Sequence, residues 1–314
     1  SVRFIDSLAI LILPAILGVL ISKNSYNENE KIDFAILQPN ISINDKRNIS
    51  TSHAIQDLLE KSENYLSEKN DRILIWPETA FNHYNNQINN QVKTALEGTN
   101  INLLSGVYEI NENAYNSIYY LNDKNNYSLI NAEKYRKIKM VPGAEQVPFS
   151  NVFPFLSNMA LVGNLTKGLE YKIFDYKDSK FGAMVCIEST FPNLARQFVR
   201  NGAEFLVYVA NDGWYIKPAE AYQHAKQTIF RAIETRKSIL RCGNTGVSWV
   251  VSPNGEIVKE LEHNSEGLLT SDGIEIYSNS EKTIYLILGD WIAYLSIIVV
   301  LFLSLKGIIR KVKK

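Results

Sequence analysis

Three side chains of this sequence have the chemistry of a nucleophilic substitution, and the first is Cys186. The run Phe181-Gly-Ala-Met-Val-Cys-Ile-Glu188 has the length and composition of a buried strand that ends on this cysteine. The end of a strand is a suitable place for the nucleophile of an α/β enzyme. A free cysteine is also a small hydrophobic residue, so the alternative is that Cys186 belongs to the core. This segment alone does not decide between the two.

The second side chain is Glu78, in Trp76-Pro-Glu-Thr-Ala80. Pro77 has no N–H for a sheet ladder, so we expect the preceding strand to stop there and to leave Glu78 on a loop. A carboxylate enclosed by Trp76 and apolar neighbours can have a raised pKa and act as a general base. The alternative, of equal weight, is a carboxylate that caps a helix.

The third is Lys137, in Tyr135-Arg-Lys-Ile-Lys-Met-Val-Pro-Gly-Ala-Glu145. Alternating lysines are typical of a solvated strand edge. Pro142 and Gly143 then predict a turn before Glu145. A lysine close to a thiol would favour the thiolate and stabilise an oxyanion, so this segment could complete a site that contains Cys186.

The elements that must position these groups alternate along the chain. Strands are expected at 32–38, 72–76, 180–187, 204–210, 247–251 and 257–261, and helices at 53–69, 193–201 and 219–240. A hairpin is expected at 116–121 and 127–130, around the turn 122–126. This interleaving predicts an α/β or α+β domain with a mixed sheet.

Composition excludes several functional classes. The 314 residues include 33 basic and 33 acidic side chains, and the absence of a long basic block argues against nucleic acid as a partner. Two cysteines are too few for a disulfide scaffold, and we interpret Cys242 as a core thiol. The histidines lack metal-ligand spacing, so we expect no metal site and ordinary surface or interface positions for all four. They are His53, His83, His224 and His263.

Both ends of the chain are apolar. Residues 1–24 and 283–305 are each predicted to form a transmembrane helix, and the basic tail 306–314 is predicted to stay in the cytoplasm. Residues 25–282 would then lie together on the other side of the membrane. The first segment could instead be the core of a signal peptide, but no suitable cleavage site follows it. The second could be an amphipathic helix packed on the domain, but Ile297–Leu303 is apolar all round.

Glu78, Lys137 and Cys186, in this order and in these local contexts, resemble the Glu-Lys-Cys triad of the nitrilase, or carbon–nitrogen hydrolase, superfamily. The resemblance covers roughly residues 30–270. It implies an α/β fold, an α-β-β-α sandwich, with these three residues as the catalytic groups and with no cofactor. Further matching segments are Asn211-Asp-Gly-Trp214, Gln223-His224, Arg231-Ala-Ile-Glu234, Arg241 and Asn244-Thr-Gly246.

The two predicted spans make the chain similar to the C-terminal part of one branch, the bacterial apolipoprotein N-acyltransferases. The resemblance implies a multi-pass protein of the inner membrane with its catalytic domain on the periplasmic side. It also implies transfer of a fatty acyl chain from a membrane phospholipid, through a Cys186 thioester, to the α-amine of a diacylglyceryl apolipoprotein. Glu145 and Glu188 would support the triad and Trp214 would bind substrate. Gly143-Ala144 and Ile187 depart from the usual family pattern.

The stretch Phe149–Leu165 is more apolar than an ordinary solvated loop. We expect Phe153, Phe155, Leu156 and Met159 to form an arm that dips toward the lipid bilayer over the site, with Phe153, Phe155 and Met159 binding substrate. The alternative is that these side chains cover the domain core.

Two other functions fit the same residues. In a membrane-tethered amidase of the nitrilase type, water rather than an amine would resolve the thioester. In a catalytically inactive membrane scaffold, Cys186 would be an unreactive structural thiol.

Overall fold

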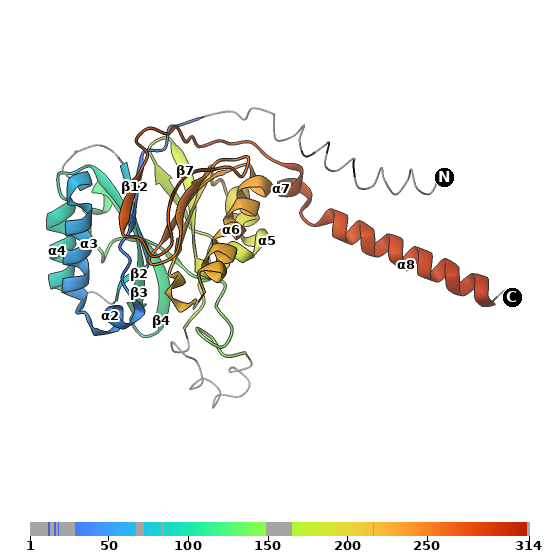
Figure 1. Ribbon diagram of the computed structural model, residues 1–314, viewed down its shortest axis with the longest axis horizontal. Helices are drawn as coiled ribbons and strands as arrows, with labels where there is room; N and C mark the ends of the chain where they lie inside the picture. Colours follow the sequence, from blue (N-terminus) through green and yellow to red (C-terminus); the bar gives the residue numbers. More distant parts are fainter. Residues whose placement is uncertain are drawn as a thin grey trace.

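The computed structural model describes residues 29–66, 72–82, 85–148, 165–215 and 217–312, together with positions 12, 16 and 18. Within these residues, two six-stranded sheets pack face to face between two layers of helices (Figure 1). The α-β-β-α sandwich implied by the resemblance is therefore confirmed. In spatial order, the first sheet consists of β12 (Gly267–Thr270), β1 (Phe34–Gln38), β2 (Arg72–Asn82), β3 (Ile101–Ile110), β4 (Ala114–Leu121) and β5 (Glu133–Arg136).

The second sheet places its parallel strands at the centre. Its order is β11 (Ile257–Leu261), β10 (Ser248–Val251), β9 (Ser238–Gly243), β8 (Phe205–Ala210), β7 (Ser179–Val185) and β6 (Ile173–Tyr176). Strands β7, β8 and β9 pair in parallel, as do β1, β2 and β3 in the first sheet. Strands buried on both faces are continuously apolar, as β8 is in Phe-Leu-Val-Tyr-Val-Ala. Parallel pairing also brings the carboxyl ends of these strands to one edge, where Cys186 follows β7.

Aromatic side chains hold the two sheets together. Phe181 stacks on Phe205 within the second sheet, with ring centroids 5.1 Å apart. Tyr120 of the first sheet meets the face of Phe181 edge-on at 5.3 Å. The outer layers are α3 (Thr51–Leu66) and α4 (Asn86–Leu96) on one side, and α5 (Pro192–Arg200) and α6 (Pro218–Thr235) on the other (Figure 1). Trp76 anchors α3 by donating its indole N–H to Ser62 Oγ at 3.2 Å.

Three expectations about the elements were wrong. Strand β2 does not stop at Pro77 but continues to Asn82, with a shift in its pairing to β3 after Trp76. Strand β4 pairs antiparallel with β3, which we had not expected, and with β5; the second strand of the expected hairpin is therefore Glu133–Arg136, and residues 127–130 form no strand. The long helix expected at 219–240 ends at Thr235, and β9 begins at Ser238. Local apolar periodicity did not separate these last two elements, because β9 is buried throughout and its polar residues, Ser238 and Arg241, do not alternate with apolar ones.

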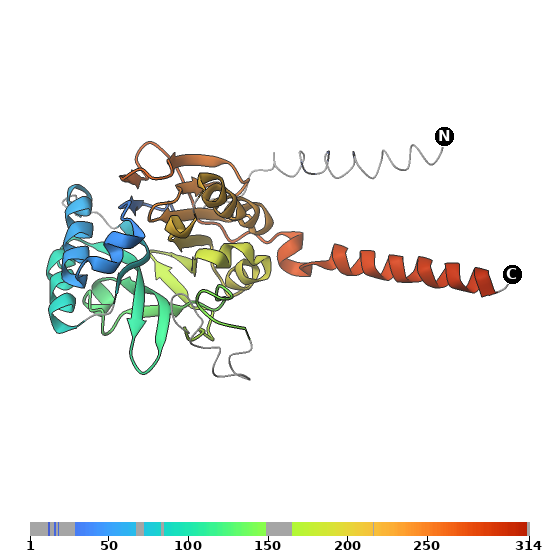
Figure 2. The same cartoon turned by 60° about the horizontal axis from the view of Figure 1, so that its bottom comes forward.

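Residues 283–305 are divided between two helices, α7 (Ile284–Leu288) and α8 (Trp291–Val312), which meet at Gly289 with φ of 62°. The guanidinium of Arg196 donates to the backbone carbonyls of Tyr285, Leu286 and Ile287, and so fixes the end of α7 on α5. Figure 2 shows α8 extending away from the sandwich. No helix in the described part of the chain is both long and apolar enough to cross a membrane. Residues 1–24 and the predicted arm lie outside the described ranges, apart from positions 12, 16 and 18.

Candidate active site

Cys186 is the first residue of a short 3₁₀ turn, η3 (Cys186–Thr190), which connects β7 to α5. Its φ of 52° lies in the left-handed region. A residue with a Cβ holds this conformation at a cost of roughly 1–3 kcal/mol, so the surrounding contacts must stabilise it. The side chain is partly exposed, unlike that of Cys242, which is fully buried and is confirmed as a core thiol.

Glu78 lies in the irregular part of β2, between Trp76 and Phe81, where the pairing with β3 shifts. The loop approaches β3 so closely that a Cβ on Gly106 would lie 2.5 Å from the carbonyl oxygen of Pro77. Only a glycine fits there. The Glu78 carboxylate is buried and accepts hydrogen bonds from Asn116 Nδ2 and from the backbone N–H of Asn211, both at 2.8 Å.

Lys137 follows β5 directly, and its ammonium lies between two buried carboxylates. Its Nζ is 2.8 Å from Glu145 Oε1 and 3.5 Å from Glu78 Oε1. Asn116 Nδ2 donates to the same two oxygens, at 3.0 and 2.8 Å. Burial opposes the charge of Lys137, but Glu78, Cys186 and Glu145 outweigh it and raise the lysine pKa, so this side chain is an ammonium at neutral pH.

The Cys186 thiol has its pKa raised well above the usual value, first by burial and then by the negative charge of Glu78. Lys137 acts in the opposite direction, as we expected, but does not prevail. The resting thiol is therefore protonated at neutral pH. A reaction at this sulfur needs a base that removes the proton during attack.

Glu188 connects the cysteine turn to the lysine segment. Its carboxylate accepts from the backbone N–H groups of Val185 at 2.7 Å, Ile138 at 2.7 Å and Lys139 at 2.9 Å. The hydroxyl of Tyr135 donates to it at 2.8 Å. Glu188 is fully buried, so these four donors replace the water that a carboxylate requires. Glu188 thus connects the segment that follows Lys137 to the end of β7, directly before Cys186.

Trp214, the predicted substrate-binding residue, is 51% exposed on the turn η4 (Asp212–Trp214). The guanidinium of Arg47 lies 5.7 Å from the centroid of its ring. Arg47 belongs to the short helix α2 (Ile43–Asn48), which therefore borders the site. The other predicted substrate-binding residues, Phe153, Phe155 and Met159, lie outside the described residues.

Sequence reasoning missed two polar side chains that contact Glu78. Asn116 bridges Glu78 and Glu145, as described above. Lys46 of α2 donates to the carbonyl oxygen of Glu78 at 3.0 Å and to Thr79 Oγ1 at 3.1 Å, and burial lowers its pKa to about 8. Lys46 comes from a polar stretch whose pattern is that of ordinary surface, and Asn116 is one polar residue in a predicted strand, so neither gave a signal. His224 is also buried, which corrects our expectation of an exposed or interface position.

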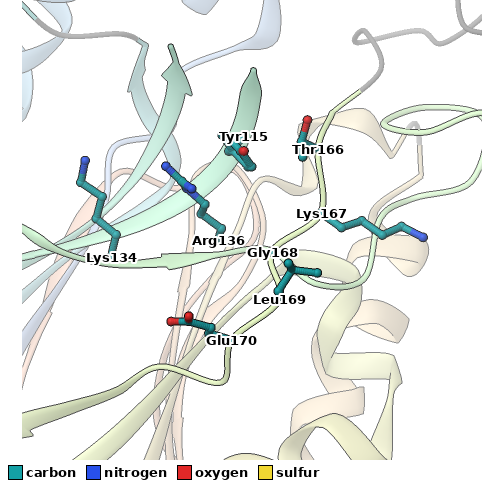
Figure 3. Close-up of a pocket in the computed structure, with 8 residues that line it drawn as sticks. All are labelled: Tyr115, Lys134, Arg136, Thr166, Lys167, Gly168, Leu169 and Glu170. Carbon is teal, nitrogen blue, oxygen red and sulfur yellow. The ribbon is translucent and has the colours of Figure 1, made fainter. Parts of the chain in front are cut away.

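Within the described residues, no group of three or more His, Cys, Asp or Glu side chains is placed to hold a metal ion. A cavity of about 360 Å³ lies beside β5, and Glu78, Lys137, Glu145 and Cys186 are not among the residues that line it (Figure 3). Lys134 and Arg136 line it from β5, and residues 166–170 form its other side. Arg136 makes a double hydrogen bond to the buried carboxylate of Glu109. The positive charge of this guanidinium is thus balanced within the protein.

The sequence matches the family described as "Carbon-nitrogen hydrolase" over residues 34–272, which is more than half of the chain. The chain belongs to the carbon–nitrogen hydrolase family. Among solved members of this fold, the carbon–nitrogen hydrolase of Helicobacter pylori superposes with a TM-score of 0.60 at 16% identity, covering 79% of this chain and 89% of the other. An amidase from Nesterenkonia sp. superposes with a TM-score of 0.58 at 14% identity, covering 76% and 92%. These identities support the shared fold alone.

Sequence relatives narrow the comparison within the carbon–nitrogen hydrolases. The apolipoprotein N-acyltransferase of Aquifex aeolicus is 32% identical over 278 residues, which is 84% of this chain and 60% of the relative. That of Thermotoga maritima is 28% identical over 300 residues, or 92% and 55%. The chain is therefore similar to apolipoprotein N-acyltransferases over most of its length, and spans little more than half of theirs.

Proposed function

We propose that this carbon–nitrogen hydrolase family member is an N-acyltransferase that uses Cys186 as its nucleophile. The acyl donor is a membrane phospholipid, and the acceptor is the α-amine of the diacylglyceryl-cysteine at the N-terminus of an apolipoprotein. The observation that carries the proposal is the buried ammonium of Lys137, held between Glu78 and Glu145 at the strand end that presents Cys186. The names of the sequence relatives supply N-acyl transfer with an apolipoprotein, and the phospholipid donor and the diacylglyceryl group follow from the resemblance given above.

In the first half-reaction, Cys186 Sγ attacks the ester carbonyl carbon while Glu78 takes the thiol proton. Removal of the proton must accompany attack, because the resting thiol is neutral. The ammonium of Lys137 stabilises the oxyanion of the tetrahedral intermediate. Collapse breaks the bond to the lysophospholipid oxygen, which leaves with the proton from Glu78. Cys186 is then an acyl thioester.

In the second half-reaction, the neutral α-amine of the acceptor attacks the thioester carbonyl and Glu78 takes a proton from the amine nitrogen. The carbon–sulfur bond breaks, and the proton passes to the leaving Cys186 sulfur. The product is an amide, and the cysteine returns to its resting thiol. Glu145 takes no part in the proton transfers; its carboxylate holds Lys137 at 2.8 Å and keeps the ammonium aimed at the oxyanion.

Helix α8 is the segment that we propose to hold the domain at the inner membrane, with the catalytic domain on the periplasmic side. The supporting observation is that its apolar side chains are exposed, including Ile298 at 62% and Phe302 at 63%. Such side chains need an apolar surrounding. Residues 1–24 would provide a second attachment, and the arm with Phe153, Phe155 and Met159 would guide acyl chains from the bilayer to Cys186.

The second candidate is a membrane-tethered amidase, in which water attacks the acyl-enzyme. It is favoured by the shared fold with the Nesterenkonia amidase, which is described with acrylamide added to its active-site cysteine. The two functions share every step up to the thioester and differ in the group that resolves it.

One incubation separates the two functions. The full chain in detergent micelles receives a phospholipid with an isotopically labelled acyl chain and a synthetic diacylglyceryl-cysteine peptide. Mass spectrometry then measures label on the peptide α-amine and in free fatty acid. We expect label on the amine, and none with Cys186→Ser. Label in free fatty acid alone, at a rate independent of the peptide, would reject the transferase and support the hydrolase.

A further inference from the structure

A buried row of polar side chains lies behind the turn that begins at Cys186 and takes no part in the proposed chemistry. It consists of Ser189 on η3, His224 on α6, Asp212 on η4 and Arg241 on β9, each at most 6% exposed. Ser189 Oγ lies 3.3 Å from His224 Nε2. His224 Nδ1 lies 2.7 Å from Asp212 Oδ1, and Arg241 Nη2 donates to Asp212 Oδ2 at 2.7 Å. These contacts thus join side chains from four separate elements.

The charges of these four side chains set the direction of the hydrogen bonds between them. Burial opposes the Asp212 charge, but Arg241 and His224 lower the carboxyl pKa to about 2, so Asp212 is ionised. An ionised carboxylate only accepts, hence His224 carries a proton on Nδ1. Nε2 is then the ring atom that faces the hydroxyl of Ser189. The ring of Tyr215 packs against His224, with its centroid 5.8 Å from that of the imidazole.

The order of contacts is that of a serine hydrolase triad, but Ser189 is not a second nucleophile. Its side chain points at the imidazole and the residue is only 2% exposed, so no substrate carbonyl can reach Oγ. The hydroxyl has a different use. It attaches the turn that begins at Cys186 to α6, and Arg231 Nη1 strengthens the attachment by donating to the Ser189 carbonyl at 3.1 Å.

At the other end of this row of polar side chains, the residue before Asp212 contacts Glu78, the proposed base. The backbone N–H of Asn211, the residue before Asp212, donates to Glu78 Oε2 at 2.8 Å. Asp212 itself is tightly enclosed, since a Cβ on Gly246 would lie 1.9 Å from its Oδ2. The dipeptide 211–212 therefore connects the proposed base on one side with the turn of the proposed nucleophile on the other.

We propose that Asp212, His224 and Ser189 are positioning residues that keep Cys186 in its left-handed conformation and aligned with Glu78. This inference rests on the proposed use of Cys186 as a nucleophile. Glu188 fixes the cysteine turn on the side of Lys137, and Ser189 fixes it on the side of Glu78. A backbone conformation that costs free energy persists only where its surroundings hold it in this way.

The test is Ser189→Ala in the full chain, with Ser179→Ala as the matched control. Ser179 is at the opposite end of β7, is equally buried and also makes one side-chain contact, to Ser278 Oγ at 2.6 Å. The primary readout is the burst of p-nitrophenol from a p-nitrophenyl ester, which reports acylation of Cys186 without any lipid or peptide. Thermal unfolding and the kcat and KM of acyl transfer are measured on the same samples.

We expect Ser189→Ala to slow the burst and kcat about tenfold, the factor set by one hydrogen bond of typical strength, with KM and Tm close to those of the control. Ser189→Thr, which keeps the hydroxyl, should recover most of the rate. His224→Phe should show at least the same loss, because it also removes the contact with Asp212, and adding Ser189→Ala to it should cost little more, because the contact between Ser189 and His224 is already absent.

A burst rate in Ser189→Ala equal to that of Ser179→Ala would overturn the proposal, as would a loss fully explained by a lower Tm. The absence of any burst in the unmodified chain would also overturn it, because Cys186 would then not be the nucleophile. A normal burst in a chain that transfers no acyl group to the peptide would reject the proposed transferase and leave the positioning role intact.

Discussion

Replacing Lys137 with methionine should destabilise the protein strongly, because the ammonium compensates two buried carboxylates. Its Nζ lies 2.8 Å from Glu145 and 3.5 Å from Glu78. With an effective dielectric constant of about 20, these distances correspond to attractions of roughly 6 and 5 kcal/mol before desolvation is subtracted. Breaking a buried pair by removing one partner costs about 3–5 kcal/mol in net terms. We expect Lys137→Met to lower the free energy of unfolding by that amount.

The same substitution removes the proposed oxyanion donor, which should lower the burst rate by about 10²–10³-fold. Stability and catalysis can be separated by adding Glu145→Gln. The double variant has one uncompensated carboxylate fewer, so it should regain a large part of the lost stability without regaining the burst. Urea unfolding followed by tryptophan fluorescence and the p-nitrophenyl ester burst measure the two effects, with Glu145→Gln alone as the control.

Two results would refute this reasoning. If Lys137→Met unfolds at the same urea concentration as the unmodified chain, the ammonium does not compensate the two carboxylates. If Lys137→Met/Glu145→Gln acylates at the unmodified rate, Lys137 is not the oxyanion donor.

Three further predictions concern the base and its supports. Glu78→Gln should lower acyl transfer by about 10²–10⁴-fold as the base is lost. It should also slow alkylation of Cys186 by iodoacetamide at neutral pH, because the resting thiol is protonated and loses the base that takes its proton; an alkylation rate equal to that of the unmodified chain would contradict this. Gly106→Ala should cost about 1–3 kcal/mol of stability and slow the burst, since its Cβ would displace the backbone at Glu78; an unchanged melting curve and burst would show that the loop is not held there. The lowered pKa of Asp212 contributes about 2 kcal/mol to the free energy of unfolding, which is present above about pH 4 and lost as the pH falls to about 2. In Asp212→Asn, the free energy of unfolding should therefore fall less steeply as the pH is lowered through this range.

The residue pattern predicted an α/β or α+β domain and singled out the three candidate groups, and the resemblance to the nitrilase family added the sandwich. An apolar run as short as 204–210 predicts a buried strand, and β8 occupies Phe205–Ala210. Cys186 was expected at the end of such a run, and β7 ends at Val185 directly before it. These features depend on neighbouring residues only, so they can be predicted from the sequence.

The parts that were missed depend on contacts between distant segments. Pro77 looked like a strand end, but β2 continues because an irregular stretch lets its pairing with β3 resume at Phe81. Asn116 gave no signal, since its partners Glu78 and Glu145 lie 38 and 29 residues away in the chain. His224 looked like a surface residue until the fold placed Asp212 beside it. No pattern along one element reports such a pairing.

The most direct test of the account is to isolate the acyl-enzyme. The full chain is incubated with phospholipid in the absence of acceptor, then quenched in acid and analysed by mass spectrometry. We predict a mass increase of one acyl chain on the peptide that contains Cys186, removable by hydroxylamine and discharged when the diacylglyceryl peptide is added before the quench. No adduct, an adduct on another residue, or discharge at the same rate with and without the peptide would contradict it.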